Sequence, residues 1–150
     1  MKKIVFILVC AVFTTYATAQ QKQTQQDAFQ STYNSIKSLV QSKDYKFNGT
    51  FVYSNKNREQ LTTDTNTLVV KRNNANVNII GLSFNNKTIT TKGSIQNYKV
   101  TFNDEKQIIT INFKVNNAEF YLDIKPNGNT FLTAKSSGVT ITQIGKLIKL

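Results

Sequence analysis

The sequence ITINFKVNNAEFYLDI, residues 109–124, decides the fold. Apolar and polar side chains alternate through both halves of this stretch, a period of two that is typical of strands with one buried face. Between the halves, Asn116-Asn117 has the composition of a two-residue hairpin turn. Such a turn places all the apolar side chains on one face, because residues opposite each other in a hairpin share a face. The predicted pairs are Val115 with Ala118, Phe113 with Phe120, Ile111 with Leu122 and Ile109 with Ile124.

The alternation continues on both sides of this hairpin. Pro126-Asn127-Gly128 predicts a three-residue turn, in which the glycine is free to take a positive φ. That turn sets Leu122 opposite Leu132, Phe120 opposite Ala134 and, on the outer face, Glu119 beside Lys135. A turn at Glu105-Lys106 likewise pairs Val100 with Ile111 and Tyr98 with Phe113. With a last turn at Ser137-Gly138 leading into residues 139–145, five consecutive strands form one meander.

A helix is predicted before the strands. Asp27 has the residue type of an N-cap, and the pattern ends near Ser42. The apolar side chains recur at spacings of four, three and four, which is one face of a helix; they are Phe29, Tyr33, Ile36 and Val40. This face is expected to pack on the sheet, and the alternative is that it binds a partner.

Shorter strands are predicted between the helix and the meander. Residues 46–53 alternate, with Phe47, Phe51 and Tyr53 on one face and Gly49 interrupting the pattern. Residues 55–66 are polar and predict a long loop. Further strands are expected at 67–72 and 76–80, joined through Asn73-Asn74, and at 87–91 before Gly93.

These elements predict a mainly β protein with one domain over residues 27–150. A meander with one apolar face must cover that face, either by closing into a barrel or by packing on a second sheet. With roughly eight strands, we expect an antiparallel up-and-down barrel or flattened barrel, with the amphipathic helix at its mouth.

The first residues are typical of a secretory signal peptide. Lys2 and Lys3 precede an apolar run over residues 4–13, and Ala17-Thr18-Ala19 offers a small-x-small cleavage motif. We therefore expect a signal peptide over 1–19, cleaved between Ala19 and Gln20, and a polar linker over 20–26. The protein would then be periplasmic or secreted, without an integral membrane span, because the apolar run is too short to cross a bilayer.

Cys10, the only cysteine, lies inside the apolar run rather than at its end. A lipid-modified cysteine would stand at the cleavage point, so a lipoprotein is not the expected product. Cleavage after Ala19 would remove Cys10 together with Met1, and the mature chain would have no disulfide and no thiol.

The net charge of +11 survives processing, since losing Lys2 and Lys3 from the 19 basic residues lowers it only to +9. For an exported protein the matching partners are anionic glycans, lipopolysaccharide phosphates or acidic proteins rather than nucleic acid. The lysines are spread along the chain and form no run, so a basic surface that only maintains solubility is the simpler alternative.

The composition excludes much catalytic chemistry. The chain has no histidine and no phosphate-binding glycine loop, and the mature chain would lack cysteine, so neither a metal site nor a cofactor is predicted. None of the eight carboxylates is predicted to be catalytic: Asp104-Glu105 forms a solvated turn tip, Glu119 and Asp123 lie on the outer face beside lysines, and Asp64 lies in a polar loop. Asn103 with Asp104 and Glu105 is the only local cluster of oxygen ligands, and one turn is not a calcium site. Aromatic side chains interleaved with lysines, such as Tyr98 and Phe113, fall on the core face and do not indicate nucleic-acid stacking.

The stretch from Gly93 onward resembles the exported bacterial family called domain of unknown function 4251, found mainly in Bacteroidota. The family's recurring elements read here as Gly93 with Tyr98-Lys99-Val100 and Asn103, Ile111 to Val115 as I-x-F-x-V, Ile124-Lys125-Pro126-Asn127-Gly128 with Leu132, and a tail at Ile141, Gly145 and Leu147. Leu39-Val40, Ser42, Lys43 and Phe47 match the family's entry helix and first strand, whereas Ile79-Ile80-Gly81 departs from it. The resemblance implies an extracytoplasmic, lipocalin-like β fold, and no activity or site residue.

Two functions are expected from these observations. One is a small binding module whose barrel interior or mouth accepts an apolar or amphipathic ligand of the cell envelope. The alternative is an interaction or structural protein whose basic outer face binds anionic glycan or protein. A hydrolase that uses carboxylates alone ranks last, so we do not expect an enzyme.

Overall fold

The computed structural model describes residues 25–54, 56–62 and 66–150. The expected signal peptide, its cleavage site at Ala19 and Gln20, and Cys10 lie outside the described residues, as does Asp64. The elements are α2 (Gln25–Ser42), β1 (Asp44–Ser54), β2 (Asn57–Gln60), β3 (Thr67–Lys71), β4 (Asn74–Ile80), the 3-10 turn η1 (Ser83–Asn85), β5 (Thr88–Asn103), β6 (Ile108–Val115), β7 (Ala118–Ile124), β8 (Asn129–Ser136) and β9 (Val139–Lys149).

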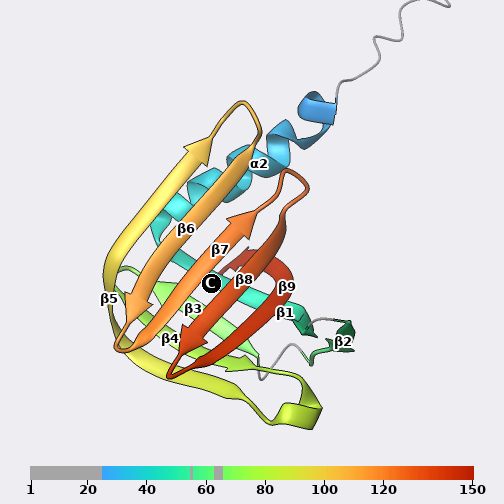
Figure 1. The fold of residues 1–150 in the computed structure, drawn as a ribbon. Helices are drawn as coiled ribbons and strands as arrows, with labels where there is room; N and C mark the ends of the chain where they lie inside the picture. The colour runs from blue at the N-terminus through green and yellow to red at the C-terminus, as the bar shows by residue number, and fades with distance from the viewer. Residues whose placement is uncertain (1–24, 55, 63–65) are drawn as a thin grey trace, which may run out of the picture.

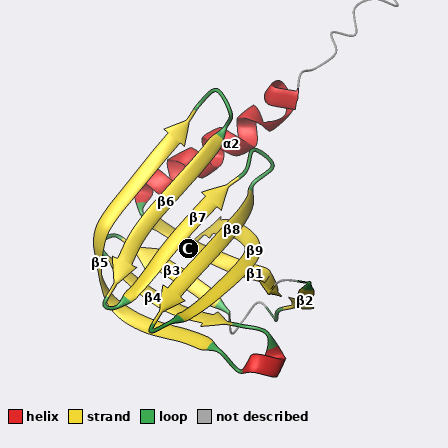
Figure 2. Ribbon diagram, viewed as in Figure 1, coloured by secondary structure: helices red, strands yellow, loops and turns green. Residues whose placement is uncertain are grey.

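The strands form one antiparallel sheet that closes into a barrel (Figures 1 and 2). Eight of them follow the order β1-β3-β4-β5-β6-β7-β8-β9, and β1 pairs with β9 to complete the cylinder. The short strand β2 pairs only with the second half of β1, outside the cylinder. The predicted mainly β, up-and-down barrel with an N-terminal helix is therefore confirmed.

The meander has the register that its turns predict. All four pairs of the β6–β7 hairpin are present, as are Leu122 with Leu132, Phe120 with Ala134 and Glu119 with Lys135. Val100 also pairs with Ile111 as predicted. Tyr98 is the exception, because the β5–β6 ladder has an irregularity between Gln96 and Lys99 and Tyr98 has no ladder partner. Its ring still lies 5.9 Å from that of Phe113, so the expected contact forms without the expected pairing.

The alternation of side chains in strand β1 differs from the prediction. Its register shifts between Gly49 and Phe51, and the bulge reverses the alternation, so that Val52 is buried. Phe51 pairs with Ile144 and Tyr53 with Thr142, both outward-facing residues of β9. Phe51 and Tyr53 therefore lie on the outside of the barrel, and the prediction that they share the face of Phe47 was wrong.

Four boundaries also differ from the sequence-based expectations. The polar stretch 55–66 contains β2, and Asn66 at its end is fully buried. The β3–β4 turn uses Arg72 and Asn73 rather than Asn73-Asn74, with Arg72 at φ 56°. The two strands expected at 87–91 and 98–102 are one continuous strand, β5. Helix α2 begins at Gln25, so the end of the predicted linker is helical and Asp27 lies in the first turn, where a carboxylate favours the helix dipole.

Helix α2 lies across one end of the barrel (Figure 1), with Tyr33 and Val40 buried. Side chains from strands that are not neighbours meet inside the barrel, for example at the Tyr45 and Tyr98 hydroxyls, which are 3.2 Å apart. Burial raises the pKa of Tyr45 well above its ordinary value, and the contact with Tyr98 adds to this. No helix among the described residues is long and apolar enough to cross a membrane.

Candidate functional site

The outer wall of β6, β7 and β8 carries two rows of side chains set by the strand register. Asn112, Tyr121 and Thr133 lie opposite one another in the first row, and Lys114, Glu119 and Lys135 in the second. These six side chains alternate with buried core residues and therefore face away from the core. They surround a hollow of about 380 Å³ on the wall, which we call the wall hollow.

Tyr121 is the exposed aromatic residue of the wall hollow, at 44% exposure, whereas Phe113 and Phe120, which also line it, are buried. A tyrosine ring offers a rigid apolar face together with a polar hydroxyl, a combination common in binding surfaces. The neighbouring Asn112 and Thr133 add an amide and a hydroxyl that donate and accept hydrogen bonds. The wall hollow thus combines one apolar platform with uncharged polar groups.

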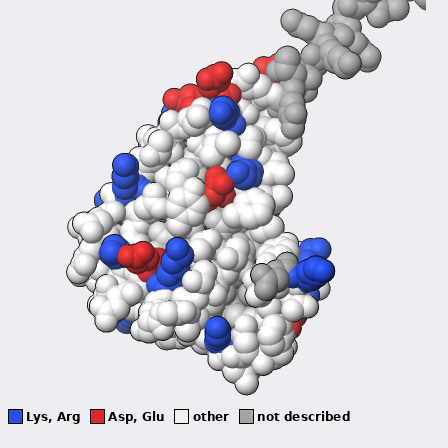
Figure 3. Space-filling view, in the orientation of Figure 1, with Lys and Arg blue, Asp and Glu red and all other residues white. Residues whose placement is uncertain are grey.

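The second row supplies charge to the wall hollow. Lys114 and Glu119 form an ion pair at 2.5 Å, and the hydrogen bond from Lys114 holds the pKa of Glu119 below its ordinary value, with Lys135 adding to the effect. Glu119 is therefore ionised at neutral pH, and the two lysines leave the row with a net positive charge. Figure 3 shows an acidic patch between basic ones on the lower part of this wall.

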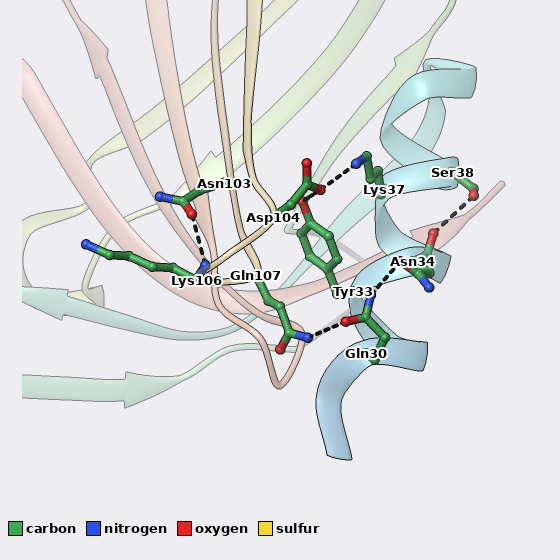
Figure 4. Close-up of polar contacts among 9 residues, drawn as sticks. All are labelled: Gln30, Tyr33, Asn34, Lys37, Ser38, Asn103, Asp104, Lys106 and Gln107. Carbon is green, nitrogen blue, oxygen red and sulfur yellow. Dashed lines mark hydrogen bonds and ion pairs between the residues drawn. The ribbon is translucent and has the colours of Figure 1, made fainter. Parts of the chain in front are cut away.

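A second polar cluster joins α2 to the β5–β6 turn (Figure 4). Asp104 accepts hydrogen bonds from the Tyr33 hydroxyl at 2.7 Å and from Lys37 Nζ at 2.5 Å. Gln107, which is 2% exposed, donates to the carbonyl of Gln26 at 2.9 Å and to Gln30 Oε1 at 2.8 Å. These contacts attach the helix to the barrel, so we interpret the cluster as structural.

Asp104 was expected to be only a solvated tip, and this expectation is corrected in part. The carboxylate is exposed, yet it fastens the helix, because Tyr33 and Lys37 both reach it. The hydrogen bond from Lys37, and then that from Tyr33, lowers the pKa of Asp104. Burial, followed by the bond to Asp104, raises the pKa of Tyr33 to about 12.

The other carboxylates singled out in the sequence also have structural neighbours. Asp123 pairs with Lys125 at 2.7 Å on the wall, and Glu119 with Lys114 as described above. Asn103 accepts from the backbone N–H of Lys106 within the turn, rather than joining Asp104 and Glu105 in a ligand cluster. Within the ranges that the structure describes, no group of three acidic, cysteine or histidine side chains could hold a metal ion.

Sequence reasoning missed Tyr121, the exposed aromatic residue of the wall hollow. It assigned aromatic residues such as Phe113 to the core, which is correct, but it gave no role to Tyr121 or Phe131, which are exposed. Both occupy positions where the alternation calls for polar residues, between Glu119 and Asp123 and beside Thr133. An aromatic residue in the polar phase of a well-defined strand is the signal that could have identified this surface.

Comparison with known proteins agrees with this architecture. The crystal structure of a DUF4251 family protein from Bacteroides eggerthii DSM 20697 superposes with a TM-score of 0.70 at 17% identity, covering 83% of this chain and 92% of that one. At that identity the likeness shows the fold alone. None of the curated proteins compared with the chain matches it. The family model described as Domain of unknown function (DUF4251) matches residues 27–146, and the chain therefore belongs to this family.

Proposed function

We propose that this protein is a binding module of the cell envelope that holds an acidic glycan in the wall hollow. The observation that supports the proposal is the Tyr121 ring, exposed on the wall in a row with Asn112 and Thr133 and next to a row with excess positive charge. The ring would pack against the apolar face of a sugar, because a flat aromatic face and a patch of C–H groups exclude water from each other. Asn112 and Thr133 would hydrogen-bond sugar hydroxyls, and Lys135 would pair with a carboxylate.

The charge of the whole chain is consistent with an anionic ligand. The net charge of +11, or +9 after the expected cleavage of the signal peptide, raises the local concentration of polyanions at the surface and accelerates encounter with them. Lys135 has no ion-pair partner within 4 Å among the described residues, whereas Lys114 is paired with Glu119. Lys135 is thus the cation of the wall hollow that a ligand can use without breaking an existing pair.

Binding of polygalacturonate, a polymer with a carboxylate on every sugar, tests the proposal directly by isothermal titration calorimetry, with neutral dextran as the comparison polymer. Tyr121→Thr and Lys135→Gln should each weaken binding at least about fivefold, equivalent to about 1 kcal/mol. Threonine is chosen because it retains strand preference. Phe84→Ser and Lys87→Gln are matched controls, since both residues are exposed around η1 and lie outside β6, β7 and β8.

The salt dependence gives a second readout. Contacts between exposed charges are screened, so affinity for polygalacturonate should fall steeply as sodium chloride rises from about 50 to about 500 mM. Equal affinity for dextran and polygalacturonate, or binding that survives both wall substitutions, would contradict an acidic-glycan site.

A second candidate function is binding of an amphipathic anion at the barrel mouth. Tyr98, Val100 and Phe102 face inward on β5 but are only partly buried near α2. Lys43 Nζ lies 4.7 Å from the Tyr98 ring centroid and Lys37 Nζ lies 5.2 Å from that of Phe102. Two ammonium groups therefore lie next to these apolar side chains of β5. Native mass spectrometry of the purified protein distinguishes this function, because a clean ligand-free mass would remove it.

A further inference from the structure

The wall hollow is one end of a longer apolar band. Along one row, Tyr121 lies opposite Thr133, Thr133 opposite Thr142, and Thr142 opposite Tyr53. In the adjacent row, Asp123 lies opposite Phe131, Phe131 opposite Ile144, and Ile144 opposite Phe51. The apolar members of these two rows form what we call the outer strip: Tyr121, Phe131, Ile144, Phe51 and Tyr53.

The outer strip crosses the seam where β1 closes the barrel against β9. The bulge after Gly49 makes this possible, because it turns Phe51 and Tyr53 outward, onto the same face as Ile144 and Thr142. Tyr121 and Phe131 are 44% and 36% exposed, and the other three members are partly exposed. From β7 to β1 the strip spans three strand spacings, or about 14 Å.

Cations border the outer strip. Lys135 lies on β8 beside the β7 end of the strip, one row beyond Thr133. At the other end the guanidinium of Arg58 lies 3.6 Å from the centroid of the Phe51 ring and 5.8 Å from that of Tyr53. Arg58 is on the extra strand β2, opposite Tyr53, so the strand that takes no part in closing the barrel extends this wall.

The outer strip is an extended surface, which fits a chain of linked units better than one small molecule. In one row the hydroxyls of Thr133 and Thr142 lie side by side between the two tyrosines, and the other row presents apolar side chains beside them, so a ligand meets flat surfaces and hydrogen-bonding groups together. The cations are spaced apart instead of clustered, which matches charges distributed along a polymer better than a single phosphate group. The acids at its border, Glu119 and Asp123, are each paired with a lysine of the wall.

We infer that the outer strip binds a linear acidic polysaccharide laid across the strands, with several consecutive sugars in contact from Tyr121 to Arg58. This inference rests on the proposed function, since it extends the ligand from the wall hollow to the seam. Sugars of one chain then bind at linked sites, and each added contact raises affinity by making the next one intramolecular. Affinity therefore increases with oligomer length until the strip is filled.

A length series of galacturonate oligomers tests the inference by calorimetry on the whole protein. The wild type should gain affinity with each added sugar and then reach a plateau. Arg58→Gln and Phe51→Thr should lower affinity for oligomers at the plateau length about fivefold while leaving the shortest oligomers unchanged. Tyr121→Thr should lower affinity at every length, and Lys92→Gln should lower none, because Lys92 is exposed on β5 opposite β4, on another side of the barrel.

These outcomes separate the two proposals. Unchanged affinity of Arg58→Gln and Phe51→Thr at every length, together with a loss for Tyr121→Thr, would overturn the outer strip and keep the wall hollow. No loss for Tyr121→Thr would remove the proposed function itself. A reversible dimer in sedimentation velocity that Phe131→Thr abolishes would assign the strip to a second copy of this chain and also overturn the inference. Guanidinium unfolding of each variant shows whether the fold is intact.

Discussion

Replacing Gln143 by leucine tests how the barrel is closed. The Gln143 side chain is fully buried on the inner face of β9 and donates to Asn66 Oδ1 at 2.7 Å and to the Ile80 carbonyl at 2.7 Å. It also accepts from Asn66 Nδ2 at 2.9 Å. Asn66 Oδ1 in turn accepts from the backbone N–H of Ile80. The two amides therefore tie β9 to the end of β4 and to the segment that enters β3.

The cost of the substitution follows from the bonds that disappear. Leucine has a similar volume but leaves Asn66 Nδ2 buried without its described partner, which costs about 1–3 kcal/mol. Losing the bond to the Ile80 carbonyl adds about 0.5–1.5 kcal/mol. The expected loss of unfolding free energy is about 1.5–4.5 kcal/mol, a large part of the roughly 5–15 kcal/mol typical of a folded domain.

Guanidinium unfolding followed by circular dichroism measures this loss. Gln96→Leu is the matched control, because Gln96 is an exposed glutamine on β5 and its replacement should change stability by less than about 0.5 kcal/mol. Asn66→Leu alone should also destabilise, and the double variant should lose less than the sum because the two residues act as a pair. A loss below about 1 kcal/mol for Gln143→Leu would refute the reasoning.

Three further predictions concern the seam, the helix and the core. Gly145→Ala should destabilise by about 1–3 kcal/mol or more in the same unfolding assay, since a Cβ there would collide with the Asn48 backbone carbonyl on β1; wild-type stability would contradict that close approach. Folding raises the pKa of Tyr33 from an ordinary 10.0 to about 12, so the neutral hydroxyl contributes fully to the free energy of unfolding below pH 10, and this contribution is lost as the pH rises toward 12. Tyr33→Phe should therefore flatten the plot of unfolding free energy against pH between these two values. Leu122→Ala should cost about 2–5 kcal/mol by leaving a cavity in the fully buried core, and a value under about 1 kcal/mol would mean that the site repacks.

The meander could be predicted in detail because two independent constraints agree in it. The period of two assigns each residue to a face, and a turn of known length then fixes which residues lie opposite. Phe113 could therefore be placed opposite Phe120, and Leu122 opposite Leu132, without any tertiary information. A slip of one residue would have placed every apolar side chain of a strand on the wrong face.

The errors arose where the backbone departs from that period. A bulge adds a residue to one strand only, so it shows no periodicity of its own, and the outward position of Phe51 and Tyr53 followed from one at Gly49. Asn66 was placed in a polar loop because its partner Gln143 is 77 residues away, and a buried amide cannot be distinguished from a solvated one without that partner. Strand β2 was missed since its four residues are polar and mostly exposed.

Exposed aromatic residues alone carry little functional information, because strands favour them on either face and folded proteins expose much apolar surface. What calls for an explanation is that five large apolar side chains occupy two adjacent rows on a closed barrel wall. Threonine has comparable strand preference, and Thr133 and Thr142 already occupy one of these two rows. If strand preference were the reason for the aromatics, Tyr121→Thr and Phe51→Thr would change nothing. If the reason were packing, both would lower the free energy of unfolding. Only a ligand-binding role requires that both substitutions leave the free energy of unfolding unchanged and weaken binding. The length of the oligomers whose binding is weakened then shows at which end of the outer strip each residue contacts the ligand.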